Sequence, residues 1–534
     1  MYLINKLDST LTLYYANFFL NFDPLELECF IKDKNHTMKK NILKKEDINK
    51  EIKNESTFLE CYFKMYRKDI VGNEYYFKTH YGQQKLLYAD WMASGRLYNT
   101  IEDILKNKIG PTLANTHSFS SQSGKITTYT YKQARKIIRT HVKANQEDIL
   151  VTTGSGMTSA ISKLIRITGW NHFKNEKPVV FITHMEHHSN QAPWYAIGAE
   201  VIILPPGDNM EVSPNILEKE LQKYADRKIK IGSFTACSNV TGEITPYYEL
   251  AAIMHRYGGQ CFVDFAASAP YADIDMHPPG EENSLDAIFF SPHKFLGGPG
   301  ACGILVFNRK LYNKPYPDNP GGGNVKWTTP WGDQNYFEDI ETREDGGTPA
   351  ILQVIRAALS MKLKEEMNID KIEARERELL SLFYKRMQEI SEIEILGNPN
   401  SKKIGCVSFN IRNIHYNLVV RLLNDRFGVQ VRGGWSCASS FSHYLFNIDE
   451  EYSKTIMHNI DQKNLTAKPG WVRISLHPTF LDAEVQFICD AIKAIVYNID
   501  SWEKDYRYNP VTNEFDSLLE NEDFHEEVGK FFRI

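Results

Sequence analysis

The sequence predicts an α/β protein in which a large domain with a mostly parallel sheet is followed by a smaller α+β domain. Two observations predict this architecture. Up to about residue 355, short apolar runs of the kind that form buried strands alternate with stretches of helical periodicity. Several of these runs end in polar residues, as strands do at the ligand-binding edge of a parallel sheet.

The chain of 534 residues divides by its pattern into four parts. The first is an extension rich in Lys, Asn, Ile and Glu, which we expect to be partly mobile. The last is an acidic tail with several aromatic side chains. The four parts are the extension at 1–80, the large domain at 81–360, the small domain at 361–500 and the tail at 501–534.

In the small domain, a long helical stretch at 368–390 comes first. The pattern then predicts strands at 393–396, 405–409 and 471–475, and helices at 416–427 and 481–497.

Lys294 follows the apolar run Ala287-Ile288-Phe289-Phe290 and is itself followed by glycines. A lysine at the end of a buried strand lies at the ligand edge of the sheet, where it can form a Schiff base. Asp264 ends another apolar run, 30 residues earlier. Pyridoxal phosphate needs this pair, because a carboxylate keeps its pyridine nitrogen protonated while a lysine binds its aldehyde.

A phosphate site is predicted upstream of the acid and the lysine. The stretch at 148–153 has the pattern of a strand, Gly154-Ser155-Gly156 that of a tight turn, and 157–169 that of a helix. Such a turn presents free backbone amides and the positive end of the helix to an anion. Two further strand ends, before Glu186-His187-His188-Ser189-Asn190 and before Ser238-Asn239-Val240, add polar groups.

In this order, the segments resemble the class V, fold-type I pyridoxal-phosphate enzymes, and within them the cysteine desulfurases and selenocysteine lyases. The resemblance extends from about residue 85 to about residue 500, and it implies fold type I with a seven-stranded-type sheet. Besides the segments above, it rests on Ser291-Pro292-His293-Lys294, Gly347-Thr348-Pro349, Arg432-Gly433-Gly434-Trp435-Ser436-Cys437-Ala438 and Val472-Arg473-Ile474-Ser475-Leu476.

The resemblance implies a role for each matching residue in binding pyridoxal phosphate. Lys294 would hold the cofactor, Asp264 would pair with its pyridine nitrogen, and His187 would stack on its ring. Thr348 would reach the phosphate of a neighbouring subunit, which implies a homodimer. The phosphate would be bound by Gly156, Met157, Thr158, Ser291 and His293.

The resemblance also implies a substrate site for a small amino acid. Asn239 would lie beside the cofactor's phenolic oxygen and the substrate, and Arg473 would hold the substrate carboxylate in its planar fork. Ala93 and Arg432 would complete the site.

Cys437 follows Arg432 and two glycines in a serine-containing loop, where a nearby arginine favours the thiolate. By resemblance, Cys437 would be the nucleophile that takes sulfur or selenium from the substrate and leaves alanine, with Lys294 and His187 as the other catalytic residues. A sulfur-acceptor protein is then a possible partner. The chain departs from the family at Trp435 and Ser436, where histidines are usual, and at Ala267, where a glutamine is usual.

Two other functions stay open. In a class V aminotransferase, or another pyridoxal-phosphate lyase or sulfurase, Cys437 would not be the nucleophile. A non-catalytic scaffold would have kept only the fold, against which the intact set of Lys294, Asp264, His187 and Arg473 argues.

The composition is that of a soluble enzyme. With 42% hydrophobic residues, 24% charged residues and a net charge of −5, the chain is neither disordered nor basic enough to suggest nucleic acid as a partner. No apolar run reaches the roughly 18 residues of a membrane span, and the apolar stretch at 11–20 is interpreted as a helix rather than a signal peptide. The eight cysteines show neither CxxC nor metal-ligand spacing, so we expect a cytoplasmic protein without a metal site.

Overall fold

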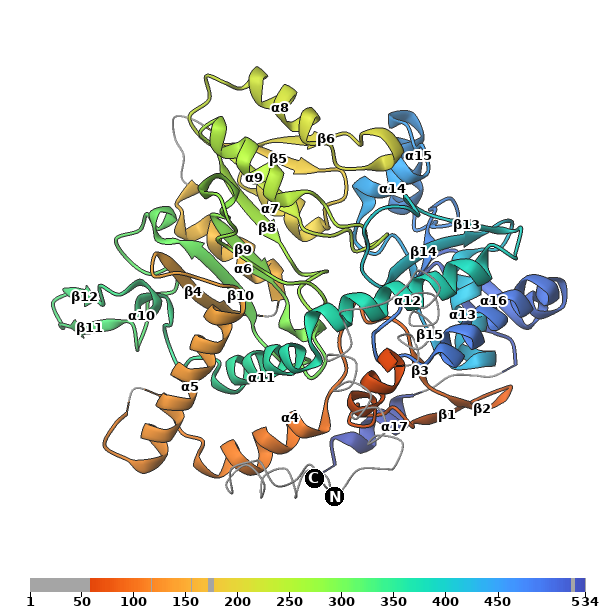
Figure 1. Cartoon of the computed structure of the whole chain (residues 1–534), viewed down its shortest axis with the longest axis horizontal. Coiled ribbons are helices and arrows are strands. Elements are labelled where there is room, and N and C mark those ends of the chain that lie inside the picture. The colour runs from red at the N-terminus through yellow and green to blue at the C-terminus, as the bar shows by residue number, and fades with distance from the viewer. Residues whose placement is uncertain (1–57, 117, 155, 171–176, 520–523, 534) are drawn as a thin grey trace, which may run out of the picture.

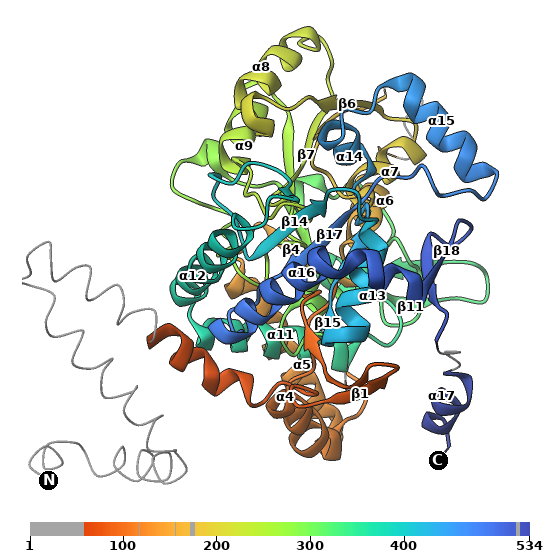
Figure 2. The same cartoon turned by 90° about the vertical axis from the view of Figure 1, so that its right-hand side faces the viewer.

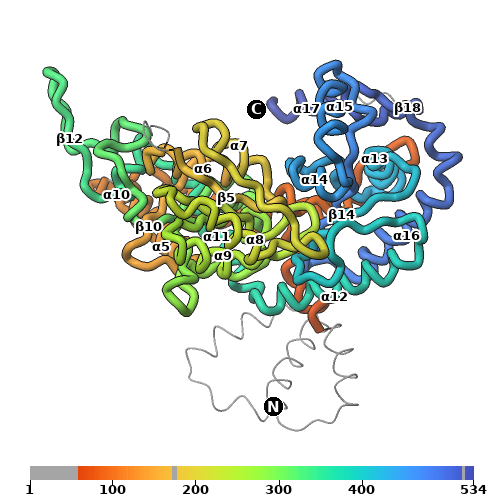
Figure 3. Tube along the Cα trace, turned by 90° about the horizontal axis from the view of Figure 1, so that it is seen from above, coloured from red at the N-terminus to blue at the C-terminus, as the bar shows by residue number. Residues whose placement is uncertain are grey.

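The computed structural model describes residues 58–116, 118–154, 156–170, 177–519 and 524–533. The chain forms two lobes, one around a large sheet and one around the C-terminal sheet, as the view in Figure 3 shows. The predicted helix at 11–20 lies outside the described residues, as does Ser155 of the predicted phosphate turn.

The large lobe contains a seven-stranded sheet, in which β10 alone runs antiparallel to its neighbours (Figure 1). The predicted mostly parallel sheet is therefore confirmed, and every strand predicted in this domain is present. The sequence analysis did not assign β6 and β10. Across the sheet, the strands are β4 (Asp148–Thr153), β10 (Gly303–Asn308), β9 (Ala287–Phe290), β8 (Gln260–Asp264), β7 (Lys230–Thr235), β5 (Val179–Thr183) and β6 (Glu200–Leu204).

Helices cover both faces of this sheet, because neighbouring residues of each strand point to opposite faces and both sets are apolar. Phe289 packs on the face covered by α6 (Gly156–Ile167) and α7 (His188–Ala196), whereas Ile288 packs on the other face. That second face is covered by α5 (Gln122–His141), α8 (Pro214–Lys223), α9 (Tyr247–Arg256) and α11 (Ile351–Met367).

Replacement of Phe289 by alanine is expected to lower the free energy of unfolding by about 3–5 kcal/mol, because the fully buried ring would leave a cavity beside the central strands. The shift of the urea unfolding midpoint measures this loss. Trp331→Ala is the control, since the indole of Trp331 is 86% exposed and should contribute little. Equal midpoints for the two variants would contradict this account of the core.

The C-terminal lobe contains a four-stranded antiparallel sheet packed against long helices. Strands and helices lie where the sequence predicts them, with β16 as an additional strand. In sheet order the strands are β13 (Ile393–Ile395), β14 (Cys406–Ile411), β17 (Trp471–Ser475) and β16 (Arg432–Gly434), and the helices are α12 (Ile369–Met387), α13 (Tyr416–Phe427) and α16 (Asp482–Trp502).

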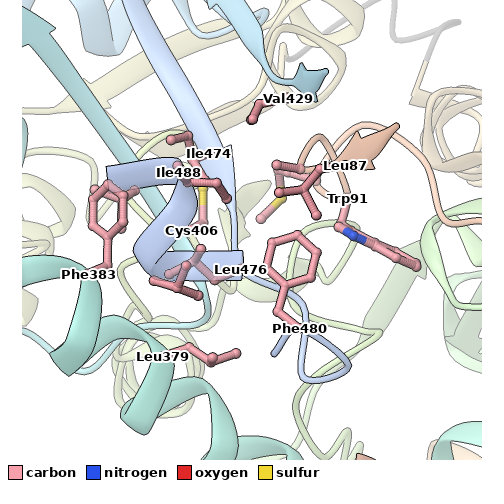
Figure 4. Close-up of a cluster of buried hydrophobic side chains, with 14 of the residues drawn as sticks. Leu87, Trp91, Leu379, Phe383, Cys406, Val429, Ile474, Leu476, Phe480 and Ile488 are labelled. Atoms are coloured by element: carbon pink, nitrogen blue, oxygen red, sulfur yellow. The ribbon is translucent and has the colours of Figure 1, made fainter. Parts of the chain in front are cut away.

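The segment from residue 58 to residue 92 packs on the C-terminal lobe. Within it, β3 (Leu87–Tyr88) pairs in parallel with β15 (Val429–Gln430). Figure 4 shows Leu87 and Trp91 in the same cluster as side chains of β17 and α16. The boundary predicted at residue 81 thus falls within a segment that shares one core with residues more than 300 positions later.

The remaining strands pair in small two-stranded sheets outside the two large ones, and Figure 2 labels several of them together with the remaining helices. These elements are β1 (Tyr76–Thr79), β2 (Gly82–Lys85), α4 (Asn99–Asp103), β11 (Val325–Thr328), β12 (Gln334–Tyr336), α10 (Ile340–Glu344), α14 (Ser439–Leu445), α15 (Glu450–Asp461), β18 (Tyr506–Asn509), β19 (Glu514–Ser517) and α17 (His525–Phe531).

No described helix is long and apolar enough to cross a membrane.

Candidate active site

A cavity of about 290 Å³ lies at the carboxyl ends of the parallel strands, where residues of the C-terminal lobe close it. All the predicted site residues except Thr348 line it. These are Ala93, Gly156, Met157, Thr158, His187, Asn239, Asp264, Ser291, His293, Lys294, Arg432, Cys437 and Arg473. The cavity is also lined by residues for which the sequence analysis proposed no contact: Met92, Ser189, Thr235, Cys237, Ala266, Ala267 and Ser436.

Lys294 and Asp264 face this cavity from the ends of two adjacent parallel strands. Asp264 ends β8, and Lys294 lies in the short turn that follows β9. Burial lowers the pKa of the Lys294 amine to about 8, although the Asp264 carboxylate partly opposes this shift. Burial likewise raises the pKa of Asp264 to about 6, while the amide of Ala266 donates to its Oδ1 over 2.8 Å. The site thus presents an amine that is readily made neutral beside a buried acid.

The start of α6 forms a cradle that is lined by a backbone amide and by hydroxyl groups. The amide of Met157 donates to Ser291 Oγ over 2.8 Å, and Thr158 Oγ1 donates to Ser189 Oγ over 2.7 Å. Gly156 has a φ of +75°, and a Cβ atom there would lie 2.7 Å from Ser291 Oγ. A side chain at Gly156 would therefore fill the cradle. Helix amides and hydroxyls around an open space fit a phosphate group.

His187 and His293 are neutral groups in this site. Burial, and then the charge of Lys294, lower the pKa of His187 to about 3 and that of His293 to about 4. His187 caps α7, and its Nδ1 accepts from the amide of Ser189 over 3.1 Å, so its proton resides on Nε2. A flat, neutral ring in the cavity wall fits stacking against an aromatic cofactor.

Arg473 and Arg432 lie opposite each other on β17 and β16. Both bind Asp90, to which the sequence analysis gave no role of its own: Arg473 contacts its Oδ1 over 2.8 Å, and Arg432 contacts its Oδ2 over 2.9 Å. Arg473 also donates to the carbonyl oxygen of Asn239 over 3.1 Å. Two arginines and one aspartate leave one net positive charge here, which suits one substrate carboxylate.

Two buried polar atoms of the site have no partner among the described residues. These are Nε of Arg473 and Oδ1 of Asn239. The amide nitrogen of Asn239 is occupied, since it donates to the carbonyl oxygen of Ser436 over 2.7 Å. Unpaired groups of this kind are costly inside a protein, and both residues belong to the lining of the cavity.

Cys437 is exposed at the edge of the cavity. It and Ser436 have positive φ angles of 57° and 50°. Each such residue costs on the order of 1–3 kcal/mol unless glycine occupies the position. The loop is therefore held in a strained conformation that keeps the thiol beside the site.

Thr348 does not line this cavity. It is exposed in the loop before α11, where Asn115 Nδ2 lies 3.4 Å from its hydroxyl.

In the described part of the chain, no cluster of three or more His, Cys, Asp or Glu side chains could hold a metal ion. The amine, the carboxylate, the flat ring and the cradle of amide and hydroxyl groups fit pyridoxal phosphate.

A model of the class-V aminotransferase family matches residues 87–488 of the chain. Over 383 residues, the chain is 30% identical to a probable cysteine desulfurase of Halalkalibacterium halodurans, which covers 68% of this chain and 90% of that protein. It is 28% identical over 390 residues to a probable cysteine desulfurase of Staphylococcus aureus strain Mu50, covering 70% of this chain and 91% of that protein.

Solved structures share the fold. The apo cysteine desulfurase of Thermococcus onnurineus NA1 superposes with a TM-score of 0.66 at 23% identity, covering 81% of this chain and 98% of that one. The cysteine desulfurase CsdA of Escherichia coli gives a TM-score of 0.62 at 19% identity, covering 77% and 94% of the two chains. These structural likenesses confirm the predicted fold type. Because the family model matches most of its length, the chain belongs to the class-V aminotransferase family of enzymes.

Proposed function

We propose that the protein is a pyridoxal-phosphate-dependent enzyme that removes sulfur from L-cysteine, or selenium from L-selenocysteine, and releases alanine. One observation carries this proposal: the exposed thiol of Cys437 lines the same cavity as the amine of Lys294 and the guanidinium of Arg473. The names of the similar curated proteins support the same reaction.

The cofactor would be held by the buried lysine and acid, by the cradle at the start of α6 and by the ring of His187. Lys294 would bind its aldehyde carbon, Asp264 its ring nitrogen, and the cradle at Gly156, with Ser291 and His293, its phosphate. His187 would cover one face of the ring. Bound pyridoxal phosphate supplies an electron-withdrawing ring that stabilises negative charge at the substrate's α-carbon.

Arg473 would bind the substrate carboxylate and so orient the α-hydrogen toward Lys294. The Lys294 amine would remove this α-hydrogen, and its lowered pKa lets it act as a base near neutral pH. Asp264 would keep its negative charge when the cofactor is bound, because a positive charge on the ring nitrogen would oppose protonation of the carboxylate.

Cys437 would then attack the substrate's sulfur as a thiolate. A bond forms between the sulfur of Cys437 and the substrate sulfur while the substrate's Cβ–S bond breaks. The electron pair of that bond stays with the carbon fragment, which takes up protons and leaves as alanine. The transferred sulfur remains on Cys437 as a persulfide, which a sulfur-acceptor protein would collect.

A second candidate reaction is transamination. It is favoured by Trp435 and Ser436, which precede Cys437 without contributing a titratable side chain. In that reaction no sulfur atom moves to Cys437, and the amino acid becomes a keto acid.

The two reactions are separated by their products. Protein loaded with pyridoxal phosphate is incubated with L-cysteine, L-selenocysteine and a panel of other amino acids, and alanine, sulfide or selenide, and keto acids are measured. Alanine in proportion to released sulfur or selenium is expected. Keto acid without alanine would support transamination, and no product from any amino acid would contradict both.

We further propose that the enzyme acts as a homodimer in the cytoplasm. The dimer is supported by Thr348, which lies exposed outside the cavity of its own chain, as expected of a residue that would reach the phosphate of another subunit. A reducing compartment is supported by the chemistry, since Cys437 must remain a free thiol between turnovers.

Replacement of Arg473 by lysine is expected to raise the KM for L-cysteine by roughly 10- to 100-fold, since a lysine cannot form two parallel hydrogen bonds to a carboxylate. The initial rate of alanine formation against L-cysteine concentration measures this change. Arg256→Lys serves as the control, because Arg256 is 46% exposed in a surface ion pair with Glu218. An unchanged KM in Arg473→Lys would contradict the role of Arg473.

The rate at which the cofactor-free protein binds added pyridoxal phosphate should depend on pH in a defined way. Only the neutral amine attacks an aldehyde, so the rate should rise about tenfold per pH unit below the pKa and level off above it. With the pKa of Lys294 lowered to about 8, the plateau begins near pH 8. Stopped-flow visible absorbance checks this; a rate still rising toward the ordinary lysine pKa of 10.5 would contradict it.

A further inference from the structure

The loop at 435–440, which carries Cys437, is bound to the large lobe through His188, a residue that the proposed reaction does not use. His188 is the first residue of α7. Its amide donates to the carbonyl oxygen of Cys437 over 2.8 Å. Its ring Nε2 accepts from the amide of Ser439 over 3.0 Å and lies 2.6 Å from Ser439 Oγ. One histidine thus contacts the backbone on both sides of residue 438.

These contacts constrain a backbone that would not hold its shape alone. Ser436 and Cys437 both have positive φ angles, 50° and 57°, in a conformation that side-chain-bearing residues rarely adopt. Such conformations persist where surrounding contacts determine them. Asn239 fixes the first residue of this pair through the carbonyl oxygen of Ser436, and His188 fixes the segment after it.

His188 must be neutral to make these contacts, because Nε2 accepts the amide hydrogen of Ser439. Burial, and then the charge of Lys468, lower its pKa and favour this form. The neighbouring ring of His187 is neutral too. His188 therefore meets the loop as a hydrogen-bond acceptor rather than as a charge.

We propose that His188 is a positioning residue that holds the Cys437 loop, and with it the thiol, against the cofactor cavity. The proposal rests on the proposed function, because the position of the thiol matters to turnover only if Cys437 receives the sulfur. His188 lies outside the groups that would hold the cofactor or the substrate carboxylate. Its loss should therefore slow the sulfur step and leave earlier binding unchanged.

Two variants and a control test this role in the cofactor-loaded protein. His188→Ala removes the acceptor, whereas in His188→Gln a side-chain oxygen at similar reach can accept from the amide of Ser439. His458→Ala is the control, because the side chain of His458 is exposed on α15, away from the 435–440 loop in the sequence. The readouts are hydrogen exchange of the amides at 436–441, visible absorbance of the bound cofactor, and the kcat and KM of alanine formation.

In His188→Ala we expect at least tenfold faster exchange at 436–441 and a kcat at least tenfold lower. The KM and the cofactor absorbance should stay within about twofold of wild type. His188→Gln should recover most of both losses, and His458→Ala should resemble wild type.

Wild-type exchange in His188→Ala would overturn the inference, and so would equal losses in the alanine and glutamine variants. Lost cofactor absorbance would overturn it as well, since His188 would then support the fold in general. If the wild-type protein makes no alanine, the proposed function fails instead, and the exchange at 436–441 still decides whether His188 holds the loop.

Discussion

Replacement of Lys294 by alanine is expected to lower the turnover of L-cysteine by at least roughly 10²- to 10⁴-fold, the contribution of one positioned acid–base group. The loss should be this large because Lys294 would have two tasks, binding the cofactor's aldehyde and moving the substrate's α-proton. It is the only lysine that lines the cavity in the described part of the chain. The visible absorbance of the lysine-bound cofactor should disappear as well.

Absorbance spectroscopy and an alanine assay measure both effects. Lys326→Ala provides the control, because Lys326 lies on the exposed β11 and pairs with Glu338 at the surface. Retention of both the absorbance and the turnover in Lys294→Ala would show that another amine binds the cofactor. Loss of activity in the control would instead indicate a general effect on folding.

Replacement of Cys437 by alanine is expected to lower the formation of alanine and sulfide from L-cysteine by on the order of 10³-fold or more, because a covalent mechanism without its nucleophile loses most of its rate. The absorbance of the bound cofactor should be unchanged, since Cys437 belongs to none of the groups that would hold it. Product assays beside absorbance spectra separate these two expectations.

Cys61→Ala is the matched control for this change, because Cys61 is a partly exposed cysteine in the helix at 58–67, on the C-terminal lobe. It should behave as the wild type. If Cys437→Ala kept its activity, or made a keto acid at the wild-type rate, transamination would be the better account of the site.

The sequence predicted those parts of the structure in which local pattern and chemistry agree. Asp264 and Lys294 each follow an apolar run, so the strands β8 and β9 and the polar residues at their ends could be recognised together. The position of β10 in the sheet could not be predicted from the sequence. It runs antiparallel between β4 and β9, and strand order depends on contacts between residues that are far apart in the sequence.

The interactions within the site were harder to predict than its members. Asp90 binds arginines 342 and 383 positions later, and nothing in the local sequence connects the three residues. The contact of His188 with the Cys437 loop was hard to predict for the same reason, since it joins α7 of one lobe to a loop of the other. The sequence analysis assigned residues 58–80 to the extension and 81–92 to the large domain, yet their apolar side chains complete the core of the C-terminal lobe.

The residues at which the chain departs from the family pattern lie in the cavity wall or in the Cys437 loop. Ala267 lines the cavity, so the glutamine that is usual there would have faced the same space. Trp435 packs against the core of the large lobe, and Ser436 accepts from Trp471 Nε1 over 3.3 Å while its carbonyl binds Asn239. These residues contribute packing and hydrogen bonds to the Cys437 loop rather than acid–base groups.

The most direct test of the central claim is the mass of the peptide that contains Cys437 after the cofactor-loaded protein has reacted with L-cysteine without a reductant. We predict that this peptide gains the mass of one sulfur atom, that the gain is reversed by a thiol reductant, and that one alanine is released for each sulfur bound. Release of alanine while the Cys437 peptide keeps its original mass would contradict the account.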